Sequence, residues 1–158
     1  MAYTTFHERL MADAVLPATV RTLLGLAHAD AVYDARRARS VKLPVEVRVE
    51  QASTENRTPS AGNEVHSHGY ELRVRRRAVE GASQSGAELK ELAKADARAL
   101  VRGLDGEDLW AVALAGDVVA VEARERTIDE VPGTRGVIES VVDVTIYTLG
   151  SGDVEVGP

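Results

Sequence analysis

Two segments of the chain alternate apolar and charged residues strictly, and this alternation constrains the fold more than any other feature. Valines alternate with Glu46, Arg48 and Glu50 across residues 45–50, and residues 70–75 repeat the pattern with tyrosine, leucine and valine at the apolar positions. A repeat of two residues is that of a β-strand with one face buried. Because the polar faces of the two segments carry complementary charges, we expect the strands to pair antiparallel.

A helical repeat appears between these segments and the C-terminal third of the chain. Ser85 and Glu88 have the spacing of a capping box, and one helix face over residues 85–104 is formed by Leu89, Leu92, Ala93, Ala97, Leu100 and Leu104. This pattern predicts a long amphipathic helix.

The first 30 residues also have a helical pattern. Thr5 and Glu8 form a second capping-box pair, which predicts a helix from Phe6. Pro17 predicts a break near residue 16, followed by a second short helix over residues 18–29.

The C-terminal third is rich in β-branched residues. Strands are expected over 110–114 and 118–125, joined by a hairpin at 115–117, and over 137–148, where the Val-rich sequence favours a central position in the sheet. The order of elements predicts an α+β fold: a mainly antiparallel sheet with a long helix and short N-terminal helices packed on one face. We expect one domain over residues 1–149, because 158 residues are too few for two ordinary domains.

Two segments lack the apolar residues that would bury them. Residues 52–69 contain mostly Ser, Thr, Asn, Gly, Pro and His and are expected to form a long exposed loop, which includes Asn56, Arg57 and Glu64. Residues 150–158 are Gly-rich and acidic and are expected to form a flexible tail.

Composition excludes several classes of protein. The chain has no cysteine, so disulfides and thiolate metal sites are absent. The polar N-terminus is unlike a signal peptide, and no apolar run approaches the roughly 18 residues that span a bilayer. The net charge of -6 disfavours tight wrapping of nucleic acid.

The candidate metal ligands are His66 and His68, which lie on the same side of an extended chain. A zinc site needs three or four ligands, and no other histidine lies in a related motif, so a solvated loop is favoured over a metal-dependent enzyme that uses this pair. Nucleophile motifs, phosphate loops and dinucleotide fingerprints are also missing from the sequence. We therefore expect no enzyme activity, no metal and no cofactor.

Two clusters of basic residues are candidate contact surfaces. Arg73, Arg75 and Arg77 lie along the second alternating strand, where pairing of the first two with the strand's acidic neighbours is favoured over a nucleic-acid surface, because no aromatic residues interleave with them. The segment 36–42 has no nearby acidic complement and is either a solvated loop or an interface to an acidic partner; its cations are Arg36, Arg37, Arg39 and Lys42.

In its order of elements the chain resembles the tail terminator proteins of long-tailed bacteriophages. The similarity lies in the strand PVEVRVE, the strand HGYELRVRRR, the helix SGAELKELAKADARALVRGL and the closing strand VVDVTIYTL. It covers nearly the whole chain but includes no short diagnostic motif.

The resemblance implies a structural virion protein, made in the host cytoplasm and located in the neck region of the tail. It implies a homo-oligomeric ring, typically a hexamer, that caps the tail tube and contacts the tail-tube protein on one side and a head-completion or connector protein on the other. The genome would pass through the channel without sequence-specific binding. Another head–tail connector or tail-completion subunit is the alternative of the same class.

Overall fold

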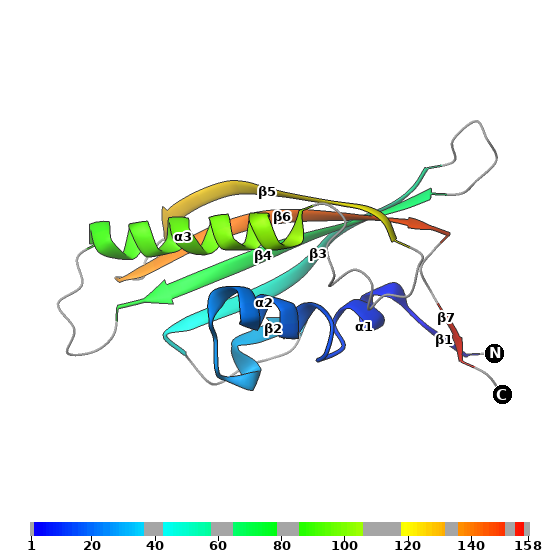
Figure 1. The fold of residues 1–158 in the computed structure, drawn as a ribbon, viewed down its shortest axis with the longest axis horizontal. Coiled ribbons are helices and arrows are strands. Elements are labelled where there is room, and N and C mark those ends of the chain that lie inside the picture. Colours follow the sequence, from blue (N-terminus) through cyan, green and yellow to red (C-terminus); the bar gives the residue numbers. More distant parts are fainter. Residues whose placement is uncertain are drawn as a thin grey trace.

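The protein is described from a computed structural model that covers residues 2–36, 43–57, 65–78, 86–105, 118–131, 136–150 and 154–156. Along the chain the elements are β1 (Ala2–Thr4), α1 (Phe6–Leu10), α2 (Leu16–Leu24), the 3-10 helix η1 (Ala29–Ala31), β2 (Val32–Asp34), β3 (Val45–Arg57), β4 (Val65–Arg77), α3 (Gly86–Leu104), β5 (Val118–Glu130), β6 (Val137–Leu149) and β7 (Val154–Val156). Figure 1 shows α3 lying along the main sheet, with α1 and α2 beside it.

The main sheet has five strands in the order β2-β3-β4-β6-β5. The pairs β3–β4, β4–β6 and β5–β6 are antiparallel, whereas the three-residue strand β2 runs parallel to β3. The predicted α+β class and the antiparallel pairing of the two alternating segments are confirmed. Strand β6 lies between β4 and β5, so the interior position expected for the closing strand is confirmed as well.

Capping residues define the start of α1 and the end of α2. The Thr5 hydroxyl accepts the Glu8 N–H, and the Thr5 N–H donates to the Glu8 carboxylate, both at 3.2 Å, so the predicted capping box of α1 is present. Pro17 lies in the first turn of α2, where a missing N–H is tolerated. The second helix was expected to extend to residue 29, but it ends at Leu24 because Gly25 adopts a left-handed conformation with φ 67°.

The core lies between the three α-helices and one face of the sheet. Inner-face side chains of the strands pack with buried side chains of α1, α2 and α3; its largest members are Tyr70, Leu10, Leu16, Leu72, Leu100, Leu104 and Ile146. The helix α3 contributes the face predicted from its periodicity, apart from Leu92, which is exposed. An added Cβ at Gly103 would lie 2.3 Å from a methyl carbon of Leu23, so glycine permits the close approach of α3 to α2.

Within the described residues, no helix has both the length and the hydropathy needed to cross a membrane.

The strands β3 and β4 are longer than the alternating pattern indicated. Residues 52–57 and 65–69, which were expected to belong to an exposed loop, form paired strand, so the loop prediction is wrong for those residues. The β3–β4 pair extends beyond the end of α3 (Figure 1). Ser67 and His68 of β4 are buried although they are polar, and buried polar residues do not register in an apolar pattern.

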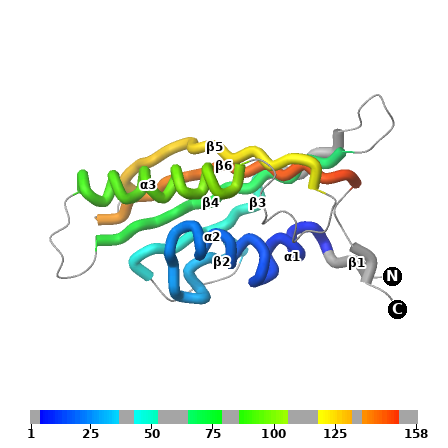
Figure 2. The backbone as a smooth tube through the Cα atoms, viewed as in Figure 1, coloured from blue at the N-terminus to red at the C-terminus, as the bar shows by residue number. Residues whose placement is uncertain are grey.

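The two ends of the chain meet in a small sheet of their own. Thr4 pairs with Val154 and Ala2 with Val156, so part of the tail that was expected to be flexible forms strand β7. Figure 1 shows β1 and β7 side by side at one end of the molecule, and Figure 2 follows the chain through α3 and the strands of the main sheet. The strand expected over 110–114, the hairpin at 115–117 and the cap residue Ser85 lie outside the described residues.

Candidate functional site

The face of the sheet that points away from the helices is covered by charged side chains, and Arg73 is at its centre. Its guanidinium donates to Glu50 on β3, Glu71 on β4 and Glu139 on β6, each at 2.9 Å. A planar guanidinium has five N–H donors in a fixed arrangement, so one arginine connects three carboxylates from three strands.

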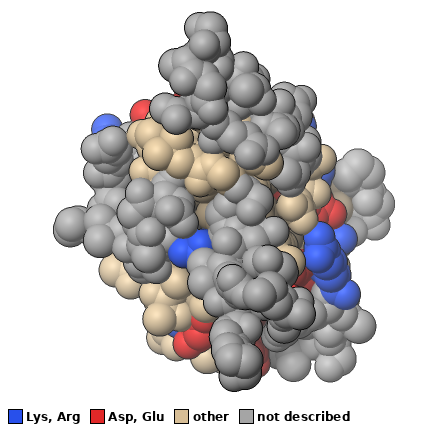
Figure 3. Space-filling view, turned by 90° about the vertical axis from the view of Figure 1, so that its right-hand side faces the viewer, with Lys and Arg blue, Asp and Glu red and all other residues tan. Residues whose placement is uncertain are grey.

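The network continues from Arg73 across both neighbouring strands. Further ion pairs join Arg75 to Glu139 (2.7 Å), Arg126 to Glu71 (2.8 Å) and to Asp143 (3.5 Å), Arg48 to Glu50 (3.2 Å) and Arg77 to Glu46 (3.4 Å). Five arginines (48, 73, 75, 77 and 126) therefore meet five carboxylates (46, 50, 71, 139 and 143), so the charges within this network balance. Figure 3, which looks at one end of the molecule, shows basic side chains gathered on one flank with acidic ones close by.

The environment favours the charged forms of Glu71 and Arg73. Burial raises the pKa of Glu71, but the hydrogen bonds and charges of Arg126 and Arg73 outweigh it and hold that pKa below its usual value. Burial lowers the pKa of Arg73, and its three carboxylate partners raise it above the ordinary range of arginine. The ionised forms of Glu71 and Arg73 are therefore both favoured by their partners.

The pairing predicted from the sequence is confirmed in part. Arg73 pairs with Glu50 as expected, but Arg75 pairs with Glu139 instead of Glu46, although it is opposite Glu46 in the register. Glu46 instead accepts from Arg77 and from the Leu43 N–H. The charged residues of β5 and β6 complete the network, and no alternating pattern in the sequence pointed to them.

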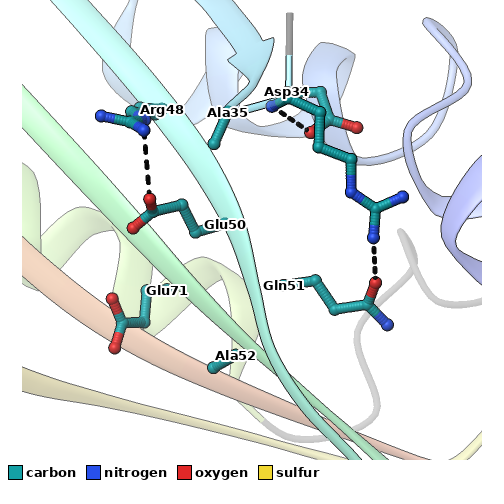
Figure 4. A pocket seen from close by; sticks show the side chains of 8 residues that line it. Asp34, Ala35, Arg48, Glu50, Gln51, Ala52 and Glu71 are labelled. Atoms are coloured by element: carbon teal, nitrogen blue, oxygen red, sulfur yellow. Dashed lines mark hydrogen bonds and ion pairs between the residues drawn. The ribbon is translucent and has the colours of Figure 1, made fainter.

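An open hollow of about 500 Å³ lies at the edge of the sheet where β2 ends beside β3. It is lined by Asp34, Ala35, Arg36, Arg48, Glu50, Gln51, Ala52 and Glu71. In Figure 4, Glu50 and Glu71 lie on one side of β3, and Asp34 and Gln51 on the other. The Arg36 side chain donates to the Gln51 amide oxygen at 2.6 Å. Of the four cations predicted in segment 36–42, only Arg36 is described; Arg37, Arg39 and Lys42 lie outside the described residues.

The two histidines that were expected in a solvated loop belong to strand β4. His68 is 3% exposed, and its ring stacks on Phe6 of α1 with a centroid separation of 4.0 Å. The Thr148 hydroxyl donates to the Gly150 carbonyl, so it accepts from His68 Nε2 at 3.0 Å. His66 is half-buried and stacks on His68 at 6.4 Å. His68 was expected on a contact surface, but α1 covers its side chain.

The remaining predicted interface residues are at the far end of the β3–β4 pair. Asn56 and Arg57 are the last two residues of β3, opposite His66 and Val65, and Glu64 lies outside the described residues. Among the residues that the structure describes, no group of three or more His, Asp or Glu side chains is placed to hold a metal ion.

A buried polar chain that the sequence did not reveal joins α1, β2 and β4. His7 contacts the Asp34 carboxylate through Nε2 at 2.6 Å and the Tyr70 hydroxyl through Nδ1 at 3.2 Å. Burial raises the pKa of Asp34, but the hydrogen bonds from the Arg36 N–H and His7 outweigh it and leave that pKa below its usual value. Burial raises the pKa of Tyr70, which is 1% exposed. The order carboxylate–imidazole–hydroxyl resembles a catalytic chain, but no substrate reaches a hydroxyl at that depth.

Comparison with known proteins identifies a shared fold. No family model and no curated protein matches the sequence. Among solved structures, a chain of the virion of the native gene transfer agent (GTA) particle is similar, with a TM-score of 0.53 and 21% sequence identity. The similarity covers 92% of each chain, so it extends over the whole α+β architecture.

Proposed function

We propose that this chain is a structural virion protein, a tail terminator that forms a ring on the end of the tail tube and joins the tail to a head-completion protein. The observation that carries the proposal is the fold shared with a chain of the GTA virion over 92% of both chains. The order of elements that resembles tail terminators is independent of that comparison and suggests the same class of protein.

The charged face is consistent with a subunit that DNA passes without being retained. Retention of DNA depends on cations that neutralise phosphates, and the five arginines of this face are already matched by five carboxylates. The chain as a whole carries a charge of -6, which further disfavours phosphate contacts.

The test is assembly with the tail-tube protein encoded by the same virus. The purified chain is mixed with preformed tubes, and the products are measured by electron microscopy and by mass. The expected result is a ring at one end of each tube and an arrest of tube growth. A chain that binds neither tube end, or that binds along the whole tube, contradicts the proposal.

The same experiment separates a terminator from another subunit of the neck. A gold-labelled chain found at the head side of the junction, and never on isolated tubes, identifies a different head–tail connector or tail-completion subunit. A labelled chain on isolated tube ends identifies a terminator.

A further inference from the structure

The two edges of the main sheet differ in charge. One edge carries the hollow beside Arg36, and the opposite edge is the acidic strand β5. We propose that the acidic side chains of β5 in one copy of the chain dock at the hollow beside Arg36 of the next copy, so that copies join head to tail. This inference rests on the proposed ring and specifies the contact that closes it.

Arg36 supplies the cation at the receiving edge. Its only side-chain partner among the described residues is the neutral amide of Gln51, and Asp34 accepts the backbone N–H of Arg36 instead of its guanidinium. A guanidinium that is held by an amide, at the mouth of an open hollow, retains donors for an incoming carboxylate.

The carboxylates that line the hollow are already engaged. Glu50 accepts from Arg48 and Arg73, Glu71 accepts from Arg73 and Arg126, and Asp34 is bound to His7. The charge of Arg36 helps to lower the pKa of Asp34, but among the described residues the Arg36 guanidinium forms no ion pair with a carboxylate. The edge therefore favours an acidic partner over a basic one.

Strand β5 supplies the acids at the opposite edge. Its exposed carboxylates are Glu122, Glu125, Asp129 and Glu130, and none of the last three has an ion-pair partner among the described residues. Arg126 is committed to Glu71 and Asp143, which leaves Arg124 as the cation of this strand outside the network. With four acids and two arginines, β5 carries a net charge of -2.

The backbone of β5 is partly protected against strand addition, which favours a contact made by side chains. The Ala123 N–H, which would otherwise be open at the edge, donates to the Asp105 carboxylate at 2.8 Å. Irregularities between Val118 and Ala120 and between Glu125 and Thr127 interrupt the strand on either side of it. Bulges and charges are the usual protection of an edge strand against pairing with another chain.

A closed ring requires the arrangement that these two edges provide. Successive subunits of a ring contact each other through two different patches, and the patches have to lie on different sides of the subunit. Strands β2 and β5 are the first and last strands of the sheet, so the basic and acidic sites face away from each other.

The inference is tested with charge reversals and sedimentation velocity over a concentration series. Two variants are made: one carries Arg36→Glu, and the other carries both Glu125→Lys and Asp129→Lys. Each variant alone should raise the concentration at which rings form by about tenfold or more, because like charges then meet at the contact. An equal mixture of the two variants should restore assembly, since each kind of contact is again between opposite charges in an alternating ring. Arg98→Glu on α3 is the matched control, because Arg98 is an exposed arginine that belongs to neither edge strand, and it should assemble like the wild type.

The outcomes distinguish this contact from the ring itself. If the wild type forms rings and Arg36→Glu forms them equally well, the docking contact is wrong and the proposed function stands. If the variants fail alone and also fail when mixed, the proposed pairing of these two edges is wrong. A wild-type chain that stays monomeric at all concentrations and on tail tubes overturns both.

Discussion

Arg76 of β4 and Asp96 of α3 form a two-point ion pair in which Arg76 Nε and Nη2 each donate to one carboxylate oxygen. Asp96 is 5% exposed, so this pair fixes the long helix to the sheet from within the interface. Unlike the charges of the outer face, it is on the helix side of the sheet, where water does not replace a lost partner.

Replacing Asp96 by Ala should therefore destabilise the protein strongly. The change leaves the Arg76 guanidinium largely buried without an anion, and breaking a buried pair in this way lowers the free energy of unfolding by about 3 kcal/mol. Urea unfolding followed by circular dichroism measures the loss. The matched control is Glu91→Ala, which breaks the exposed pair with Lys94 in the same helix and should cost no more than about 0.5 kcal/mol. Equal losses for the two variants would contradict the structural role of Arg76–Asp96.

Acid should weaken the fold partly through Asp34. Its pKa is lowered in the folded protein from the usual 3.8, so it contributes stability that is fully present above that value and is lost as the pH falls through the folded pKa. Asp34→Asn should therefore be less stable than the wild type near pH 7, and the difference should shrink as the pH falls below about 4. Unfolding free energies measured between pH 3 and pH 7 test this; a difference that is independent of pH would show that the Asp34 charge is not involved.

The charged face should respond to acid in the same direction. Glu71 also has a lowered pKa, so Glu71→Gln should reduce the acid dependence in the same way. Asp30→Asn is the control, because Asp30 is exposed and its N–H, not its carboxylate, makes the recorded contact. It should leave the free energy of unfolding at pH 7 unchanged.

The parts of the fold that could be predicted are those with a strong local period. Helix α3 follows from apolar residues that repeat every 3.6 positions. The pairing of residues 45–50 with 70–75 follows from apolar residues that repeat every two positions. Both repeats are visible in a short stretch of sequence and do not depend on residues far along the chain. Strand β2 was missed because three residues are too few to display a period. The far half of the β3–β4 pair was missed because His68 is buried by Phe6, which is distant in sequence and contacts it only in the folded chain.

Residues of the charged face could be predicted only where they lie on a single strand. Arg73, Arg75 and Arg77 were found as an alternating row, whereas Glu139 became the partner of Arg75 through the register of β4 against β6. His7 meets Tyr70 across 63 residues, and its contact spans α1 and β4. Contacts of this kind depend on the packing of elements, which local sequence patterns do not encode.

Two buried hydroxyls on β6 provide the last prediction, because only one of them is satisfied. Ser140 and Thr148 are both 0% exposed, but the Ser140 hydroxyl has no hydrogen-bond partner among the described residues, whereas the Thr148 hydroxyl binds His68 and the Gly150 carbonyl. Ser140→Ala should therefore leave the free energy of unfolding unchanged or raise it by up to about 1 kcal/mol. Thr148→Val keeps the shape but removes the hydroxyl that contacts His68 Nε2, and it should lower stability by about 1–2 kcal/mol. Thermal unfolding of both variants tests the pair, and a larger loss for Ser140→Ala than for Thr148→Val would show that the Ser140 hydroxyl has a partner in the folded protein.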